Sequence, residues 1–463
     1  MKVTFFSTEV APLAKTGGLG DVCGALPLAL EKQGIEVVII LPHYLCIRVN
    51  QASIRQVNEH VTQTRIGKNI KVYLINHAEY FDREGIYGDK KGDYKDNLER
   101  FHFFSQAALE LLKTISFQAD IIHCHDWPTA LIPVLLKTKY KTDPFYQNMK
   151  SVLTIHNISY QGIFPKNEAA KLDFIEDGLM FNNRINFLHA GIMHSDCVST
   201  VSPQYAKEIQ EKEFGCGLEG TLRKRKNPVI GILNGLDETT WNSESDRFIE
   251  KTYNKENCTG KQVNKKKLQE TAQLPADADI PLFGFIGRLV EQKGLVLLKE
   301  ALAEILKLDL QLIFLGVGEE RFEHFLSDLA RQHPQKMATF LDFNETKAHQ
   351  MYAGCDFLLM PSAYEPCGLN QMISLHYGTI PIVSDRGGLV DTVKPLESAA
   401  GNGNGFVMPA YDAKTLIREM ERAVEVFKRK DDFRDLIARA FQVDFSWEKS
   451  AQDYVRLYRQ CLS

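Results

Sequence analysis

Short apolar runs alternate with helical patterns along the first two hundred residues. Helical patterns cover 22–33 and 98–113, and the apolar runs lie at 3–7, 36–41, 72–76, 120–123, 151–156 and 196–201. Strands that are apolar throughout and alternate with helices belong to parallel sheets that are covered on both faces. The pattern therefore predicts an α/β fold with a mainly parallel sheet.

This rhythm is interrupted by a polar stretch at 241–267 that is rich in Asn, Glu, Lys and Ser. The pattern then starts again, with apolar runs at 282–286, 310–315, 339–341, 357–360 and 380–384. We therefore predict two doubly wound lobes that face each other across a cleft. The predicted domains are an N-terminal lobe, a C-terminal lobe, and a C-terminal helix that packs back on the first lobe, with the bounds 1–240, 241–445 and 446–463.

Doubly wound sheets bind ligands beyond the carboxyl ends of their strands, so the residues that follow each apolar run are the informative ones. One such segment is the Lys-Thr-Gly-Gly-Leu-Gly-Asp turn, 15–21. Its glycines let backbone amides approach an anion at a helix start, and Lys15 adds a positive charge, which suits a phosphate. Neither the P-loop nor the dinucleotide spacing is present. Tight packing of the glycines is an equally good explanation of the turn taken alone.

A second cationic segment, Gly-Arg-Leu-Val-Glu-Gln-Lys-Gly at 287–294, follows the next lobe's first strand. Arg288 and Lys293 are spaced to reach one diphosphate and to stabilise the charge on a departing nucleoside diphosphate. The alternative is two solvated cations at a helix start.

Glu365 lies on a turn, 362–371, that follows another apolar run. We expect its carboxylate to accept hydrogen bonds from sugar hydroxyls, while Gly368 permits close backbone approach. Cys367 suggests a nucleophile, but a packing role is favoured because the sequence identifies no partner for its thiol. His156 follows a strand in the same way, and a lone histidine there is more often structural.

Two acidic or histidine-rich segments resemble metal sites. At 123–126 the sequence reads His-Cys-His-Asp, but alternate residues at a strand end are expected to point in opposite directions, so we predict no shared coordination. Asp277 and Asp279 lie in a polar loop and are interpreted as solvated surface. The sequence thus predicts neither a metal nor a cofactor.

Composition limits the partners and the compartment. The net charge of −4 over 463 residues gives no basic field for nucleic acid or anionic lipid. Nine scattered cysteines without a Cys-x-x-Cys pair argue against a disulfide framework and fit a reducing compartment. No apolar stretch approaches the roughly 20 residues that span a bilayer, and no leader is recognisable. We predict a cytoplasmic protein that binds no membrane and no nucleic acid.

Ten segments in register carry a resemblance to a known family. They are STEVAPLAKTGGLGDV, YKDNLERF, HCHDW, TIHNISYQGIFP, INFLHAGIMHSD, TVSPQYAKEI, ILNGLD, GRLVEQKG, MPSAYEPCGL and RGGLVDTV. In these segments the chain resembles bacterial glycogen synthases and plant starch synthases. The resemblance implies a GT-B fold and a retaining transferase that moves glucose from ADP-glucose, with UDP-glucose as the alternative donor, to an α-1,4-glucan acceptor.

The resemblance also implies roles for individual residues. The catalytic set is His156, Arg288, Lys293, Glu365 and Asp126. The donor-binding set is Lys15, Gly17, Gly18, Asp21, Asn234, Gly316, Phe343, Cys367, Gly368, Gly387 and Gly388, with Phe343 stacking on adenine. The acceptor-side set is Glu9, Tyr94 and Asn97. A second carboxylate placed as a nucleophile is not obvious, which favours front-face attack; glycoside hydrolases, in contrast, need two carboxylates.

The sequence departs from the family pattern at the turn 384–389, at Asn370, where Thr is usual, and at Phe343, where Tyr is common. These changes motivate an alternative: a catalytically weak, glucan-binding paralogue that acts in initiation or as a scaffold. A nicotinamide-dependent oxidoreductase would need a Gly-x-Gly-x-x-Gly motif with an acidic residue about 20 positions later, which is absent. Transferases acting on lipids or small acceptors usually carry a second Glu eight positions after the first, where this chain has Ile373.

Overall fold

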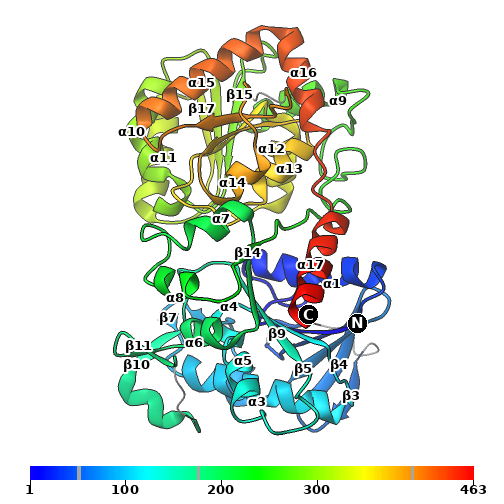
Figure 1. Cartoon of the computed structure of the whole chain (residues 1–463). Helices are drawn as coiled ribbons and strands as arrows, with labels where there is room; N and C mark the ends of the chain where they lie inside the picture. Colours follow the sequence, from blue (N-terminus) through cyan, green and yellow to red (C-terminus); the bar gives the residue numbers. More distant parts are fainter. Residues whose placement is uncertain (49–53, 175–177, 398–400) are drawn as a thin grey trace. The chain divides into compact units, whose positions relative to one another are not determined.

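The chain folds into two compact units, each built around its own parallel sheet (Figure 1). The computed structural model describes residues 1–48, 54–174, 178–397 and 401–463. Unit 1 consists of Met1–Gly235 together with Trp447–Ser463, and unit 2 of Leu236–Ser446. Each unit is a Rossmann-like α/β domain, which is the architecture of the GT-B glycosyltransferases.

Unit 1 contains, among the described residues, a nine-stranded sheet in the order β14-β13-β9-β8-β1-β2-β5-β4-β3. Its strands from β14 to β5 pair in parallel, whereas β4 and β3 are antiparallel and form one edge. The bounds are β1 Lys2–Phe6, β2 Glu36–Pro42, β3 Arg55–Asn58, β4 Val61–Ile66, β5 Ile70–Ile75, β8 Ile121–His125, β9 Lys150–Ile155, β13 Cys197–Thr200 and β14 Ile230–Gly231.

Short antiparallel pieces are the remaining strands of unit 1 among the described residues. Gly88–Asp89 (β6) pairs with Gly92–Asp93 (β7), and a three-stranded sheet contains β10 Ile163–Pro165, β11 Met180–Phe181 and β12 Arg184–Asn186. The sequence pattern predicted none of these pieces or the edge strands, because strands this short or this polar give no apolar run.

The helices of unit 1 follow the strands, as the alternation predicted. They are α1 Gly18–Lys32, α2 Ala78–Phe81, α3 Asn97–Thr114, α4 Asp126–Thr129, α5 Leu131–Lys137, α6 Phe187–His194, α7 Pro203–Glu208, α8 Glu219–Arg223 and α17 Trp447–Leu462. The last helix, drawn in red in Figure 1, lies beside α1, drawn in blue, and against β9. Its buried stripe contains Ala451, Tyr454, Tyr458 and Cys461, so an amphipathic pattern of helical period holds it on unit 1.

In the described part of unit 2, a six-stranded parallel sheet has the order β17-β16-β15-β18-β19-β20. Its strands are β15 Leu282–Ile286, β16 Gln311–Leu315, β17 Met337–Phe340, β18 Phe357–Met360, β19 Ile380–Ser384 and β20 Phe406–Met408. Three of the five predicted runs match a strand's bounds, and the other two overlap theirs. Its helices after the first strand are α10 Leu295–Ile305, α11 Glu320–Gln332, α12 Glu345–Gly354, α13 Asn370–His376, α14 Gly387–Thr392, α15 Ala413–Lys428 and α16 Lys430–Ala440.

One helix of unit 2, α9 at Thr259–Thr271, lies inside the stretch that the sequence pattern treated as a polar interruption. Its buried face carries polar side chains. Lys261 donates to the Thr379 hydroxyl at 2.6 Å, and Lys265 forms a 2.7 Å ion pair with Asp356. Because these long side chains are buried together with their partners, the helix belongs to the core although its composition resembles a surface loop.

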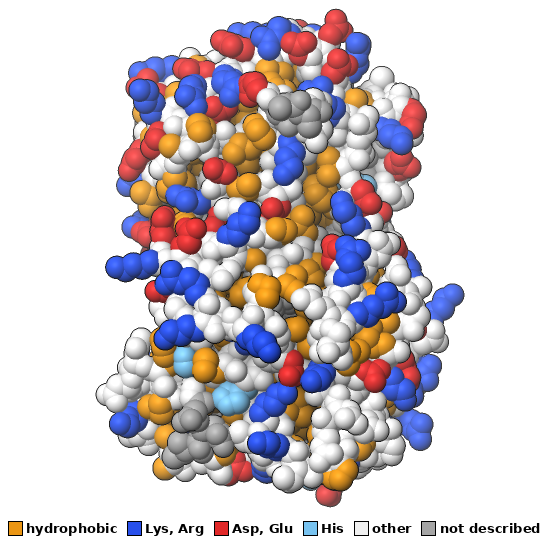
Figure 2. Space-filling view, viewed as in Figure 1, with side chains coloured by type: hydrophobic (Ala, Val, Ile, Leu, Met, Phe, Trp, Pro, Cys, Tyr) orange, Lys and Arg blue, Asp and Glu red, His pale blue; other side chains and the backbone are white. Residues whose placement is uncertain are grey.

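The surface charge and the apolar content of the helices agree with the expectations from composition. Cationic and anionic side chains are interspersed on the face drawn in Figure 2. Among the described residues, no helix is both long and apolar enough to cross a membrane.

Candidate functional site

In unit 1 the predicted residues gather at the carboxyl ends of three neighbouring strands. Strand β8 pairs with β1 on one side and with β9 on the other, all in parallel. Glu9 follows β1, Asp126 follows β8 and His156 follows β9. Parallel strands end at the same edge of a sheet, so residues separated by more than a hundred positions in sequence meet there.

The glycine turn that opens α1 is held by a buried carboxylate. Glu9 accepts hydrogen bonds from the amides of Thr16 (2.6 Å) and Gly17 (3.0 Å) and from the Tyr87 hydroxyl (2.8 Å). The predicted acceptor-side residue Glu9 thus also fixes the turn, and the amide of Gly17 is already in use. Lys15 forms an exposed 2.6 Å ion pair with Asp21.

Open space surrounds the two adjacent glycines of this turn. A Cβ atom placed on Gly17 or Gly18 would meet no atom within 4 Å, whereas one on Gly24 would lie 2.5 Å from the carbonyl oxygen of Ala11. Close packing therefore accounts for Gly24, but it does not account for Gly17 and Gly18. This difference favours approach of a ligand over tight packing at the helix start.

Asp126, the first residue of α4, directly follows β8 and has an unusual backbone conformation. Its φ of 56° lies in the left-handed region, where Asp and Asn are the non-glycine residues found most often. One carboxylate oxygen accepts the amide of His156 at 2.7 Å, which joins the ends of β8 and β9. Burial raises the pKa of Asp126 to about 7, although hydrogen bonds from the amides of His156 and Asn157 oppose the shift.

Three histidines lie in a row at this edge. His123 and His125 have ring centroids 4.1 Å apart, and Nδ1 of His125 lies 3.0 Å from Nε2 of His156. The expectation that His123 and His125 point apart is therefore wrong, because residues two apart on a strand share a face. Burial lowers the pKa of His156 to about 3 and holds the pKa values of His123 and His125 well below the usual range.

The other predicted residues of unit 1 are placed in less open surroundings. Asn97 is buried. Its side-chain NH2 group donates to the Tyr87 carbonyl, and its side-chain oxygen accepts from Arg100. The Tyr94 hydroxyl accepts the amide of Gly85 at 3.2 Å. Asn234 is buried, and its side-chain oxygen has no hydrogen-bond partner within the described part of the chain. Direct acceptor contacts by Tyr94 and Asn97 remain predictions.

In unit 2, Lys293 and Glu365 meet although 72 positions separate them. The ammonium of Lys293 lies 2.6 Å from Oε2 of Glu365, and the hydroxyl of Ser362 donates to the same oxygen at 3.0 Å. Glu365 is only 6% exposed. They meet because β15, which precedes Lys293, pairs directly with β18, which precedes Glu365.

Glycines let the loops of unit 2 touch each other. Gly294 has a φ of 83°, and a Cβ atom there would lie 1.9 Å from the carbonyl oxygen of Pro361. A Cβ atom on Gly388 would lie 2.1 Å from the carbonyl oxygen of Cys367, and the Gly388 amide donates to the carbonyl oxygen of Glu365 at 3.0 Å. The second glycine turn, at 384–389, is therefore a packing contact that supports the Glu365 turn.

The remaining donor-side candidates differ in accessibility. Phe343 is 95% exposed, which leaves its ring free to stack on a flat ligand. Cys367 is buried, as a packing role predicts. Gly316 and Gly368 have φ values of 151° and 75°. The guanidinium of Arg288 donates to the Gln292 side chain at 3.2 Å.

Sequence reasoning missed two supporting residues. Tyr87 binds Glu9 and Thr8, and it lies in a segment without periodicity. Gln292 accepts from Arg288 with its side chain and from the amide of Ala363 with its carbonyl. Gln292 lies inside the quoted Gly-Arg-Leu-Val-Glu-Gln-Lys-Gly segment, so its position next to Lys293 was the available signal.

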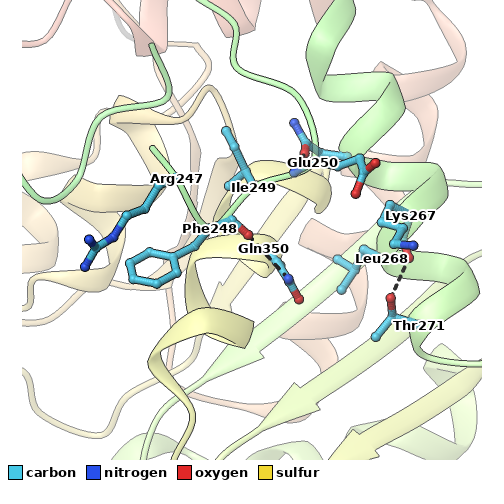
Figure 3. Close-up of a pocket in the computed structure, with 9 residues that line it drawn as sticks. Arg247, Phe248, Ile249, Glu250, Lys267, Leu268, Thr271 and Gln350 are labelled. Carbon is cyan, nitrogen blue, oxygen red and sulfur yellow. Dashed lines mark hydrogen bonds between the residues drawn. The ribbon is translucent and has the colours of Figure 1, made fainter. Parts of the chain in front are cut away.

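A separate pocket in unit 2 contains none of the predicted residues (Figure 3). It has a volume of about 240 Å³ and lies between the segment 247–250, α9 and α12. Part of its polar lining is already bonded: Gln350 donates to the Phe248 carbonyl, and Thr271 donates to the Lys267 carbonyl.

Over the described ranges, no group of three or more His, Cys, Asp or Glu side chains is arranged to hold a metal ion.

Comparisons with known proteins cover nearly the whole chain. Residues 2–224 match the family model of the starch synthase catalytic domain, and residues 266–436 match that of glycosyl transferases group 1. A glycogen synthase of Thermodesulfovibrio yellowstonii is 41% identical, with 99% of this chain and 97% of the relative covered. One of Fervidobacterium nodosum is 42% identical, with 100% and 99% covered.

Solved structures agree with these sequence matches. The catalytic domain of starch synthase IV from Arabidopsis thaliana, bound to ADP and acarbose, superimposes with a TM-score of 0.89 at 32% identity, and 99% of each chain is covered. A sucrose-phosphate synthase from Thermosynechococcus elongatus has a TM-score of 0.62 at 18% identity, with 99% of this chain and 98% of that one covered, and therefore shares the fold.

Proposed function

The chain belongs to the glycogen and starch synthase family, and we propose that it is a retaining glucosyltransferase that elongates an α-1,4-glucan from ADP-glucose. Full-length identity of about 40% to glycogen synthases supports this proposal. The structural observation that carries it is the contact between Lys293 and Glu365. A cation and a buried carboxylate side by side suit a ligand in which a diphosphate adjoins a sugar.

The proposed roles follow from this pair. Lys293 and Arg288 bind the diphosphate, and Lys15 at the glycine turn supplies positive charge for binding phosphate. Both described contacts of the Glu365 carboxylate go to Oε2, so Oε1 is the oxygen that accepts from hydroxyls of the transferred glucose. The exposed Phe343 ring stacks on the adenine.

Transfer proceeds on one face of the sugar. The bond between the anomeric carbon and the diphosphate oxygen breaks, and the acceptor hydroxyl oxygen bonds to that carbon from the same side. The departing phosphate oxygen takes the hydroxyl proton, so no protein side chain has to act as a base. The cations stabilise the negative charge that gathers on the leaving group.

Donor choice rests on the relatives. The starch synthase IV structure contains ADP, which supports an adenine nucleotide here, with UDP-glucose as the alternative donor. The same structure contains acarbose, which supports an α-glucan acceptor. We further propose a cytoplasmic location, since all nine cysteines lie in the described residues and none forms a disulfide.

A donor-by-acceptor assay tests the proposal. The purified protein is incubated with radiolabelled ADP-glucose or UDP-glucose and with maltoheptaose. We expect longer oligosaccharides from ADP-glucose, with the new bond in the α configuration. Binding of maltoheptaose without extension would instead support a glucan-binding scaffold, and extension from UDP-glucose alone would overturn the donor assignment.

Removal of single cations tests the diphosphate contacts. Lys15→Ala and Arg288→Ala are each expected to lower kcat/KM at least a hundredfold, since a charge-assisted contact to the leaving group is worth about 3 kcal/mol. Lys207→Ala, which removes another exposed lysine of unit 1, is the matched control. Full activity in both variants would refute the diphosphate contacts.

A further inference from the structure

His125 is a buried histidine that touches the predicted catalytic residue His156. Its ring is fully buried and lies between Phe5, at 5.2 Å between centroids, and His123, at 4.1 Å. Its Nδ1 atom is 3.0 Å from Nε2 of His156. The ring is therefore fixed by packing, and its one polar contact within the described part of the chain is the one to His156.

Both imidazoles are neutral, because burial lowers both pKa values far below neutral pH. A neutral imidazole has one N–H donor and one bare acceptor nitrogen. In the contact between the two rings, one nitrogen therefore donates an N–H and the other accepts it, and two arrangements are possible. Either His125 donates from Nδ1, or His156 donates from Nε2.

The second nitrogen of His125 distinguishes the two arrangements. Nε2 of His125 is buried and has no hydrogen-bond partner within the described residues. If His156 donated, His125 would carry its proton on Nε2 and bury an unpaired N–H, which is rare in proteins. If His125 donates, only a bare acceptor is left unpaired, which is tolerated more often.

The hydrogen bonds of His123 do not determine which of the two arrangements His125 adopts. Its Nδ1 atom lies 2.8 Å from the hydroxyl of Tyr458, and its Nε2 atom lies 2.6 Å from the hydroxyl of Thr154. Hydroxyls can donate or accept, so His123 is satisfied with its proton on either nitrogen.

We propose that His125 is a positioning residue that donates from Nδ1 to Nε2 of His156 and thereby holds the proton of His156 on Nδ1. His156, which is half-buried, then presents an N–H donor from Nδ1. This inference rests on the proposed function: His156 recognises an oxygen of the transferred sugar as a hydrogen-bond donor and does not act as a base.

Nitrogen-15 NMR of the histidine rings tests the proposal directly. The full chain is labelled on histidine, and a His156→Asn spectrum identifies the signals of His156. We expect Nδ1 of His156 to be protonated and Nε2 to be bare in the wild type. A wild-type spectrum with the proton on Nε2 would overturn the proposal.

Two variants at position 125 separate hydrogen bonding from packing. His125→Phe keeps a ring between Phe5 and His123 but removes the donor, and we expect the proton of His156 to leave Nδ1. His125→Asn places an amide N–H where Nδ1 was, and we expect the wild-type tautomer. An unchanged tautomer in His125→Phe would contradict the proposal.

Kinetics link the tautomer to transfer. We expect kcat to fall about tenfold or more in His125→Phe, as loss of orientation of a reacting group does, and to recover largely in His125→Asn. Equal kcat values in the two variants would overturn the role in transfer. An inactive wild type would refute the proposed function, whereas the NMR result would still decide the tautomer.

Discussion

At the scale of single residues, burial determines which predicted side chains carry a charge. Asp126 keeps its proton up to a pH of about 7 in the folded chain, whereas the unfolded chain releases it near the ordinary value of 3.8. Between these values the folded state binds more protons than the unfolded state. The stability of the folded chain therefore decreases as the pH rises through this window.

Asp126→Asn tests this linkage. Asn keeps an oxygen that accepts the amide of His156, suits the φ of 56° and does not titrate. Relative to the wild type, we expect the free energy of unfolding of the variant to rise by roughly 3 kcal/mol between pH 4.5 and pH 8, since each pH unit below the folded pKa of about 7 corresponds to about 1.4 kcal/mol. Urea unfolding at both pH values measures this, with the exposed Asp309→Asn as the control. A difference that does not change with pH would contradict the buried, protonated carboxylate.

Gly388 tests the packing of the second glycine turn. Gly388→Ala would place a methyl group 2.1 Å from a backbone oxygen, so the backbone of the Glu365 turn must move. We expect a loss of about 1–3 kcal/mol in stability, together with weaker donor binding in calorimetry. Gly220→Ala is the control, because a Cβ atom there meets nothing within 4 Å. Wild-type donor affinity in Gly388→Ala would show that this contact does not shape the site.

Sequence patterns predicted candidate residues after individual strands, but they could not predict which of these residues contact each other. Lys293 and Glu365 were each expected after a strand, yet their contact depends on β15 pairing with β18 as well as with β16. Strand order is set by the packing of the whole sheet and leaves no local mark in the sequence. The same holds for Glu9, whose two carboxylate oxygens accept hydrogen bonds from Thr16 and Gly17, contacts that no local pattern predicted.

At the scale of elements, the apolar period predicted most strands of both sheets and failed where buried residues are polar. The strands β15, β18 and β19 have the predicted bounds, because each is an unbroken apolar run. Helix α9 was missed because its buried positions include Lys261, Asn264 and Lys265. A periodicity of hydrophobic residues cannot detect a face that is buried through ion pairs and hydrogen bonds.

The ion pair between Lys265 and Asp356 is expected to hold α9 on the sheet. Asp356 also accepts the amide of Leu282 at 2.8 Å, so it connects the helix with the start of β15. Lys265→Met leaves a buried carboxylate unpaired, and we expect it to lower the free energy of unfolding by about 3–5 kcal/mol. Lys266→Met, which removes an exposed lysine from the same helix, should change it by less than about 0.5 kcal/mol. Equal effects in urea unfolding would show that the pair contributes nothing.

At the scale of the whole molecule, unit 1 is discontinuous in sequence. Its final helix, α17, arrives only after the complete unit 2. That helix contributes Trp447, which lies against Gly235, and the buried Tyr458, whose hydroxyl contacts His123 at 2.8 Å. The polar residues at the carboxyl edge of the sheet in unit 1 are thus supported by the end of the chain.

Truncation after Ser446 tests the contribution of α17. We expect the shortened chain to expose the apolar surface of α1 and β9, to bind a hydrophobic dye and to lose the unfolding transition of unit 1, while unit 2 still unfolds cooperatively. Glu448→Gln is the control, because its ion pair with Lys32 is exposed and such pairs contribute at most about 1 kcal/mol. A truncated chain with two intact transitions would show that unit 1 is complete without the helix.

The position of α17 in the sequence also determines when unit 1 can finish folding during translation. The amino-terminal part of unit 1 is translated first, but part of its apolar surface stays uncovered until α17 has been translated. The inserted half is contiguous and can finish while translation continues. The portion made earliest is therefore the portion completed latest, and chaperones that shield nascent chains should engage it throughout that interval.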